Sequence, residues 1–191
     1  IAFSVYLWNR RETLDLVDAL AVARPGLRII LGGPEISYDS NEIFIRHSGL
    51  TALIRGEGEE PLQALLQAWQ QGLPPGVIPR TVIRQAGKLI NGQDSPPLAK
   101  LDDIPSPFQL GLSDLSRGVV YFETSRGCPY HCPYCAVGQL APHGFSPRAP
   151  ERVAAEIAAL VIGDFGARRV RVRVRKFILP ESEWGGGECV V

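Results

Sequence analysis

The residues best suited to chemistry are three closely spaced cysteines, Cys128, Cys132 and Cys135, in the pattern C-x3-C-x2-C. Cysteine thiolates are the usual protein ligands of iron–sulfur clusters. Three thiolates in so short a segment can hold a cubane-type cluster while one of its irons stays free of protein ligands. Pro129 and Pro133 disfavour a regular helix between them. The spacing therefore indicates a [4Fe–4S] cluster with one open iron.

Two other uses of these cysteines remain open. The three thiolates together with His131 would form a Cys3His set, which is known in structural zinc sites. His131 directly precedes Cys132, however, and joint chelation with both flanking cysteines is then awkward. A disulfide is the second alternative, and three clustered cysteines in a chain of cytosolic character argue against it. Iron–sulfur chemistry is the favoured interpretation.

The surrounding segment, 121–135 (YFETSRGCPYHCPYC), resembles the cluster loop of the radical SAM superfamily, whose signature is C-x3-C-x-aromatic-C. The resemblance implies that Cys128, Cys132 and Cys135 hold a [4Fe–4S] cluster and that S-adenosylmethionine chelates its open iron. It further implies reductive cleavage to a 5′-deoxyadenosyl radical, which abstracts hydrogen from the substrate. Tyr134 occupies the aromatic position that packs near the adenine in the family. A packing role for Tyr134 beside the loop is the alternative.

The N-terminal part alternates strand-like and helix-like segments. Apolar and β-branched runs predict strands at 1–7, 27–31 and 52–55. Apolar residues at helical spacing, with acidic residues near the expected starts, predict helices at 11–23, 42–47 and 59–71. Strands alternating with helices indicate a parallel sheet with helices on its faces.

Three segments at the ends of these strands resemble the cobalamin-binding domain that precedes many radical SAM cores. They are 3–8 (FSVYLW), 29–35 (IILGGPE) and 54–61 (IRGEGEEP). In that family a serine turn and a Gly-Gly turn line the slot for the nucleotide tail of cobalamin. The resemblance thus implies cobalamin contacts from Ser4, Tyr6, Gly32, Gly33 and Pro34.

The chain departs from that family in one respect. The family's Asp-x-His-x-x-Gly motif, when present, precedes the serine strand, and none of His47, His131 and His143 fills its role. Whether cobalt has a histidine ligand is therefore left open. A Rossmann-like sheet that serves only as a scaffold is the alternative for this part of the chain.

Repeated prolines mark a change of pattern between 72 and 118, where only 81–84 and 88–90 look like a small hairpin. A new unit follows, with a strand predicted at 119–123, a helix at 150–161 and a strand at 168–178. We therefore predict an α/β chain with three parts. These are the C-terminal part of a B12-binding Rossmann-like domain (1–73), a Pro-rich linker with a small hairpin (74–118), and the N-terminal part of a radical SAM core, a partial (β/α) barrel (119–191).

Two C-terminal features have no assigned role. Arginine alternates with valine along 168–176, and one strand face would then be basic. Such a face could contact nucleic acid, but a solvated face is the simpler reading because the charge elsewhere is balanced. The stretch 185–188 (GGGE) is similar to an element that holds the amino group of S-adenosylmethionine in radical SAM proteins, but it lies beyond the expected strand end. Cys189 is read as a free thiol.

The composition is that of an ordinary globular protein. The 191 residues carry 20 basic and 20 acidic side chains, so no global field draws the chain to nucleic acid or anionic lipid. No apolar run approaches the roughly 20 residues that span a bilayer, and a cytoplasmic location is expected. The chain lacks methionine, and Ile1 already opens a strand-like run. We therefore expect an internal piece of a longer protein that does not complete turnover alone.

The favoured function is that of a cobalamin-dependent radical SAM enzyme that transfers a methyl group to an unreactive carbon. Oxidative cyclisation or rearrangement is the second reaction class. A non-catalytic module that binds metal or cobalamin is a further alternative. The expected partners are a small-molecule substrate and an external electron donor such as flavodoxin or ferredoxin. Nucleic acid is not favoured as a partner, and no membrane span is expected.

Overall fold

The computed structural model describes residues 1–37, 39, 41–94, 100–113, 120–128 and 145–162. The chain divides into two compact units, Ile1–Ala99 and Lys100–Val191. Among the described helices, none is both long enough and apolar enough to cross a membrane. The first unit contains the predicted alternation of strands and helices, and the second contains the approach to the cysteines.

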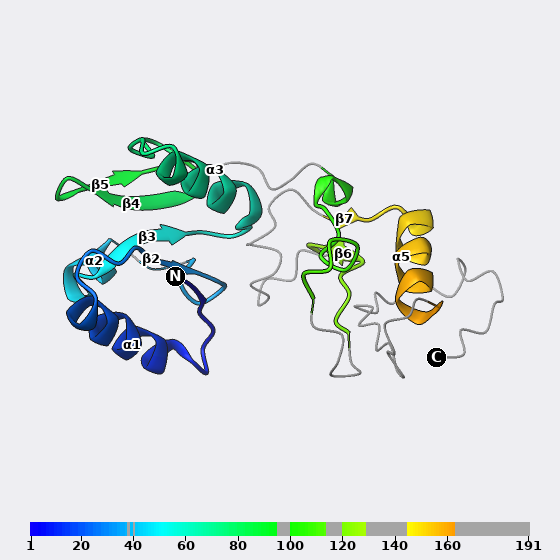
Figure 1. The fold of residues 1–191 in the computed structure, drawn as a ribbon, viewed down its shortest axis with the longest axis horizontal. Coiled ribbons are helices and arrows are strands. Elements are labelled where there is room, and N and C mark those ends of the chain that lie inside the picture. Colours follow the sequence, from blue (N-terminus) through cyan, green and yellow to red (C-terminus); the bar gives the residue numbers. More distant parts are fainter. Residues whose placement is uncertain (38, 40, 95–99, 114–119, 129–144, 163–191) are drawn as a thin grey trace. The chain divides into compact units, whose positions relative to one another are not determined.

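The first unit is built on a sheet whose described strands are neighbours in chain order (Figure 1). Its strands are β1 (Ala2–Ser4), β2 (Ile29–Gly32), β3 (Leu50–Ile54), β4 (Thr81–Gln85) and β5 (Lys88–Asn91). Strands β1, β2 and β3 run parallel, whereas β4 pairs antiparallel with both β3 and β5. The helices are α1 (Arg10–Ala23), α2 (Glu42–Arg46) and α3 (Glu59–Gln70). The predicted α/β fold with a parallel sheet is confirmed, with an antiparallel hairpin added.

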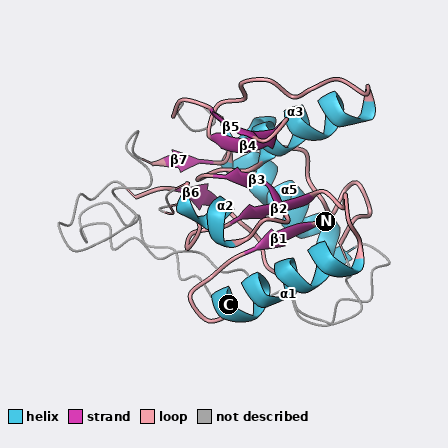
Figure 2. Cartoon of the chain, turned by 90° about the vertical axis from the view of Figure 1, so that its left-hand side faces the viewer, coloured by secondary structure: helices cyan, strands magenta, loops and turns pink. Residues whose placement is uncertain are grey.

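The two faces of this sheet carry separate apolar cores because successive strand residues point to opposite sides. Ile29 and Leu31 of β2 pack with Val17 of α1 in one core, to which α2 also contributes. Ile30, between them in sequence, packs in the other core with Leu65 of α3. Figure 2 shows α1 and α3 on opposite sides of the strands. The helical periodicity of both helices thus reflects burial of one face against the sheet.

The hairpin predicted within 74–118 is present as β4 and β5, and both strands extend the sheet of the first unit. The two residues between them, Ala86 and Gly87, have φ of 49° and 75°. Two successive positive φ angles are the mark of a type I′ turn, which matches the twist of a tight hairpin. Part of the predicted linker, 74–118, therefore belongs to the sheet of the first unit.

The second unit is smaller in its described part. It contains a 3-10 turn at Leu101–Asp103, a two-stranded ribbon of β6 (Ser125–Arg126) and β7 (Ser146–Pro147), and helix α5 (Pro150–Ile162). Val120, Phe122 and Leu160 form its buried core. The helix predicted at 150–161 is confirmed.

One strand of the second unit was predicted too early in the chain. Residues 120–124 form no strand in the described part, and regular pairing begins only at Ser125. Val120 and Phe122 are buried while Tyr121 is exposed, so the apolar alternation is real. A strand also needs a neighbour to accept its hydrogen bonds, and no described segment forms a ladder with 120–123. The strand predicted at 168–178 lies outside the described residues.

Candidate functional site

The carboxyl ends of β1, β2 and β3 gather at one edge of the sheet, where open α/β folds bind their ligands. Ser4 pairs with Gly32 in the register of β1 and β2. The amide of Val5 donates to the carbonyl of Gly32 over 2.7 Å. The structure thus brings the serine turn and the glycine turn side by side. Tyr6 and Pro34 follow directly in the same two turns.

The two glycines of the second turn serve different purposes. Gly33 has φ of +104°, and a Cβ there would lie 2.6 Å from the carbonyl oxygen of Val5. Gly33 is therefore required by the fold, because the turn packs directly on the backbone after β1. A Cβ on Gly32 would meet nothing closer than the carbonyl oxygen of Ile54, at 3.8 Å. Gly32 is not required sterically, because a Cβ there would make only ordinary van der Waals contact, and its missing side chain leaves the backbone bare at the strand end.

Ser37 joins the second and third strand ends. Its hydroxyl donates to the carbonyl of Gly33 over 3.0 Å and accepts the amide of Gly56, also over 3.0 Å. Gly56 follows β3 by two residues and has φ of +65°. Sequence reasoning did not identify Ser37, because no local spacing links it to the turn after β3. The contact exists only once the sheet has formed.

An aromatic pair stands above the first strand end. The rings of Tyr6 and Trp8 stack with centroids 4.6 Å apart and an interplanar angle of 7°. Asn9 fixes the turn that carries them. Its Oδ1 accepts the Tyr6 amide over 2.7 Å, and its Nδ2 donates to the Ser4 carbonyl over 3.1 Å. Because Trp8 remains 77% exposed, the pair offers a flat apolar surface to a ligand.

An ion-pair network holds the chain after the glycine turn. One terminal nitrogen of Arg10, at the start of α1, lies 2.9 Å from Asp39, and the other lies 3.6 Å from Glu35. The hydrogen bond that Arg10 donates to Asp39, together with the charges of Asp39 and Glu35, raises the pKa of Arg10 against a smaller lowering by burial. Arg10 therefore stays charged and ties α1 to the segment that follows Gly33.

The second unit brings the chain to its first cysteine through the short ribbon. Ser125 pairs with Pro147 and Arg126 with Ser146, so β6 and β7 face each other at the two ends of residues 127–145. Cys128 is half-buried and lies two residues after β6. Cys132, Cys135, Tyr134 and the alternative ligand His131 lie outside the described residues. The predicted ligand set thus stays a prediction.

One comparison with known proteins matches part of the first unit to a family. Residues 1–66 match the B12 binding domain. This match contains all of the predicted cobalamin contacts, which lie at the ends of β1 and β2. Their individual roles stay predictions.

Similar proteins extend the resemblance past the B12 binding domain. The chain is 29% identical over 167 residues to the cobalamin-dependent radical SAM methyltransferase TokK of Streptomyces tokunonensis, covering 82% of this chain and 24% of TokK. It is 28% identical over 134 residues to an anaerobic magnesium-protoporphyrin IX monomethyl ester cyclase of Synechocystis, covering 65% of this chain and 25% of the cyclase. The predicted resemblance to radical SAM proteins with a B12-binding domain is confirmed. The chain spans about a quarter of the length of these relatives.

A solved structure shows the same fold. The cobalamin-dependent S-adenosylmethionine radical enzyme OxsB, with aqua-cobalamin and S-adenosylmethionine bound, superposes with a TM-score of 0.70 at 21% identity. The match covers 94% of this chain and 26% of OxsB. The chain therefore has a known α/β fold.

The third strand end of the first unit is held by Arg80, which sequence reasoning also missed. Arg80 is 6% exposed, and its guanidinium lies 3.2 Å from Glu60 and 3.7 Å from Glu57. Its carbonyl accepts the amide of Arg55 over 2.8 Å. Arg80 has φ of 60°, a conformation that side-chain-bearing residues seldom adopt. These contacts connect β4 to the loop after β3.

We expect Arg80→Met to lower the free energy of unfolding by about 1–2 kcal/mol, because it removes a charge-assisted hydrogen bond to Glu60 and an ion pair with Glu57. Urea unfolding of the chain measures this loss. Arg46→Met is the matched control, since the Arg46–Glu42 pair is 3.8 Å apart and 76% and 71% exposed. An exposed pair contributes about 0–1 kcal/mol. Equal losses of unfolding free energy in the two variants would contradict the role of Arg80 in connecting β4 to the loop after β3.

Proposed function

We propose that this chain is the cobalamin- and cluster-binding part of a radical SAM methyltransferase. The observation that carries the proposal is the combination in one chain of a matched B12 binding domain with the C-x3-C-x2-C segment. Cobalamin binding belongs to 1–73 and cluster binding to the core that begins at 119. The segment between them supplies a hairpin to the sheet.

The cobalamin tail is proposed to lie along the carboxyl ends of β1 and β2. Ser4 and Pro34 are exposed there, and Gly32 presents bare backbone. A long, thin tail needs strand ends without bulky side chains. The end of β2 at Gly32 is such a strand end. The stacked Tyr6 and Trp8 offer an apolar surface at the same edge. The residues present fit the group that the family match names.

The cluster is proposed to bind through Cys128, Cys132 and Cys135, with Tyr134 beside the adenine of S-adenosylmethionine. The donor set is chemically suited, because three thiolates satisfy three irons and leave the fourth for a substrate cofactor. When bound, the cluster would supply the electron that cleaves S-adenosylmethionine, and cobalamin would carry the methyl group. The half-buried position of Cys128 after β6 fixes where this loop begins.

Methyl transfer to an unreactive carbon is the preferred reaction because the relative TokK is a cobalamin-dependent radical SAM methyltransferase. The cyclase relative favours a second candidate, oxidative cyclisation or rearrangement. A small-molecule substrate and an external one-electron donor, such as flavodoxin or ferredoxin, complete either proposal.

Anaerobic reconstitution with iron and sulfide tests the proposal. We expect ~4 irons and ~4 sulfides per chain and a broad absorption near 400 nm that dithionite bleaches. Addition of S-adenosylmethionine should change the EPR spectrum of the reduced cluster. Stoichiometric zinc without iron would instead favour the non-catalytic module, and an EPR spectrum insensitive to S-adenosylmethionine would contradict the enzyme.

Gly32→Val is expected to weaken cobalamin binding by about tenfold or more, which corresponds to about 1.4 kcal/mol. The new side chain would cover the bare backbone at the strand end. The variant should still fold, because a Cβ at this position makes only ordinary contact with Ile54 and valine suits a strand. Titration of the chain with aquacobalamin, followed by absorbance, measures the effect.

The matched control is Ala2→Val, which enlarges a side chain at the opposite end of β1. It should leave cobalamin affinity unchanged. Unchanged affinity in Gly32→Val would place the cobalamin tail elsewhere on the domain.

A further inference from the structure

The two ends of the cysteine segment are joined by a short stem. We use this name for residues 124–126 and 146–148, which include β6 and β7. Two register pairs join them, Ser125 with Pro147 and Arg126 with Ser146. A third bond extends the ribbon, because the amide of Arg148 donates to the carbonyl of Thr124 over 2.9 Å. Each side of the stem is so short that the ladder alone gives it little stability.

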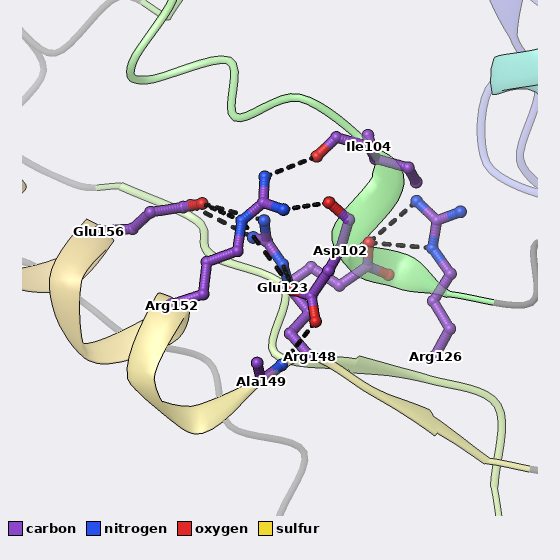
Figure 3. A network of polar contacts seen from close by, with 8 residues as sticks. All are labelled: Asp102, Ile104, Glu123, Arg126, Arg148, Ala149, Arg152 and Glu156. Atoms are coloured by element: carbon purple, nitrogen blue, oxygen red, sulfur yellow. Dashed lines mark hydrogen bonds and ion pairs between the residues drawn. The ribbon is translucent and has the colours of Figure 1, made fainter.

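A buried carboxylate meets this stem from α5. The side chain of Glu156 has no exposed surface and lies 3.0 Å and 3.2 Å from the two terminal nitrogens of Arg148 (Figure 3). Arg152, one helical turn before Glu156, donates through Nε to the same carboxylate over 3.1 Å. Two guanidiniums thus compensate one buried charge, and the Arg148 pair has the bidentate geometry that fixes direction as well as distance.

The same two arginines also contact the small core and the 3-10 turn of the second unit. The guanidinium of Arg148 lies 5.4 Å from the ring centre of Phe122, which is in the small core. Arg152 donates to the backbone carbonyls of Asp102 and Ile104. The Asp102 carboxylate in turn accepts the amide of Ala149 over 2.9 Å. We call Asp102, Arg148, Arg152 and Glu156 the clamp.

Stability alone is a poor explanation for the clamp. A buried ion pair adds little to folding compared with apolar side chains of similar size, because removing two charges from water is costly. Its directional bonds do fix one arrangement of the groups that it joins. Here those groups are both ends of the stem, through Thr124 and Arg148, and the helix that follows the cysteine segment. The position of the clamp therefore indicates control of loop geometry.

We propose that Glu156 is a positioning residue for the cysteine loop. Through Arg148 it holds the stem closed, and the closed stem sets the place of Cys128, two residues after β6. Glu156 touches neither cluster nor cofactor in this role. The inference rests on the proposed function, since a loop position matters only if Cys128 is a ligand.

Glu156→Gln keeps the shape of the side chain and removes the charge that the two arginines share. In the metal-free chain, hydrogen exchange of the peptide covering 146–148 should become faster by about tenfold, because the Arg148 amide loses protection when the stem opens. In the reconstituted chain, iron release to a chelator should also become about tenfold faster, as for other outer residues that orient metal ligands. The EPR spectrum should broaden.

Two controls separate positioning from general destabilisation. Glu151→Gln makes the same chemical change at an exposed position of α5 and should leave both rates unchanged. Val153→Ala loosens the packing of α5 on the small core without touching the clamp. It should lower the thermal unfolding temperature yet leave the EPR spectrum as in the wild type.

A double variant keeps the test decisive if Glu156→Gln does not fold. Arg148→Met with Glu156→Leu replaces the pair by apolar side chains and should fold, as buried ion pairs often tolerate. It should still open the stem and release iron faster. If hydrogen exchange shows an opened stem in the variant but iron release stays as in the wild type, this inference alone is overturned. A variant whose stem stays closed would also overturn it. A wild-type chain that takes up no iron would instead overturn the proposed function.

Discussion

Cys128→Ala is expected to lower iron uptake from ~4 atoms to fewer than ~1 per chain, because two remaining thiolates cannot hold a cubane cluster firmly. The absorption near 400 nm should disappear with it. The secondary structure should survive, since Cys128 lies past the stem and outside the apolar core of its unit. Iron analysis after anaerobic reconstitution, beside a far-ultraviolet circular dichroism spectrum, measures both.

The control for this result is Cys189→Ala, which removes the one cysteine outside the C-x3-C-x2-C pattern. It should retain full iron and an unchanged spectrum. The assignment fails if Cys128→Ala keeps its cluster, or if both variants lose iron equally. Because cobalamin is assigned to the other unit, cobalamin affinity should be the same in both variants.

Gly33→Ala is expected to lower the free energy of unfolding by about 3 kcal/mol, from backbone strain and overpacking together. The added methyl would lie 2.6 Å from the oxygen and 2.8 Å from the nitrogen of Val5. Both are backbone atoms, and Val5 is fully buried, so neither can move aside easily. The φ of +104° adds to the cost, because side-chain-bearing residues avoid it.

Urea unfolding followed by tryptophan fluorescence measures this loss, and Gly32→Ala provides the comparison one residue away. Gly32→Ala should unfold within about 0.5 kcal/mol of the wild type, because its nearest contact is at van der Waals distance. Equal stability of the two alanine variants would contradict the claim that Gly33 is required sterically and Gly32 is not. A wild-type stability for Gly33→Ala would show that the turn can move away from β1.

Much of the first unit was predictable because its signals are local. The apolar spacing in α1 follows from burial of Val17 against the sheet, and Ala86-Gly87 gives a hairpin its turn. Gly32 and Gly33 were found as a pair, but no local pattern distinguishes the role of one from that of the other. That separation depends on the distance to Val5, which exists only after β1 and β2 have paired.

The supporting residues could not be predicted for the same physical reason. Ser37 and Arg80 act through partners about twenty residues away, and Glu156 acts through Arg148, which reaches it only when the stem and α5 have formed. Each of the three looks like an ordinary polar residue in its own segment. Glu156 is the clearest case, since helical spacing alone places it on the apolar side of α5, where a charge is costly unless paired. A charged residue on the buried face of a predicted helix was the one available signal.

The hairpin also determines where the first unit can be divided. β3 pairs with β2 on one side and with β4 on the other, so it is an interior strand. A chain cut after α3, at the boundary that its proline-rich segment suggests, would leave one side of β3 unpaired. Unpaired strand edges recruit other strands and promote aggregation. A smaller, soluble version of this unit must therefore continue beyond β5.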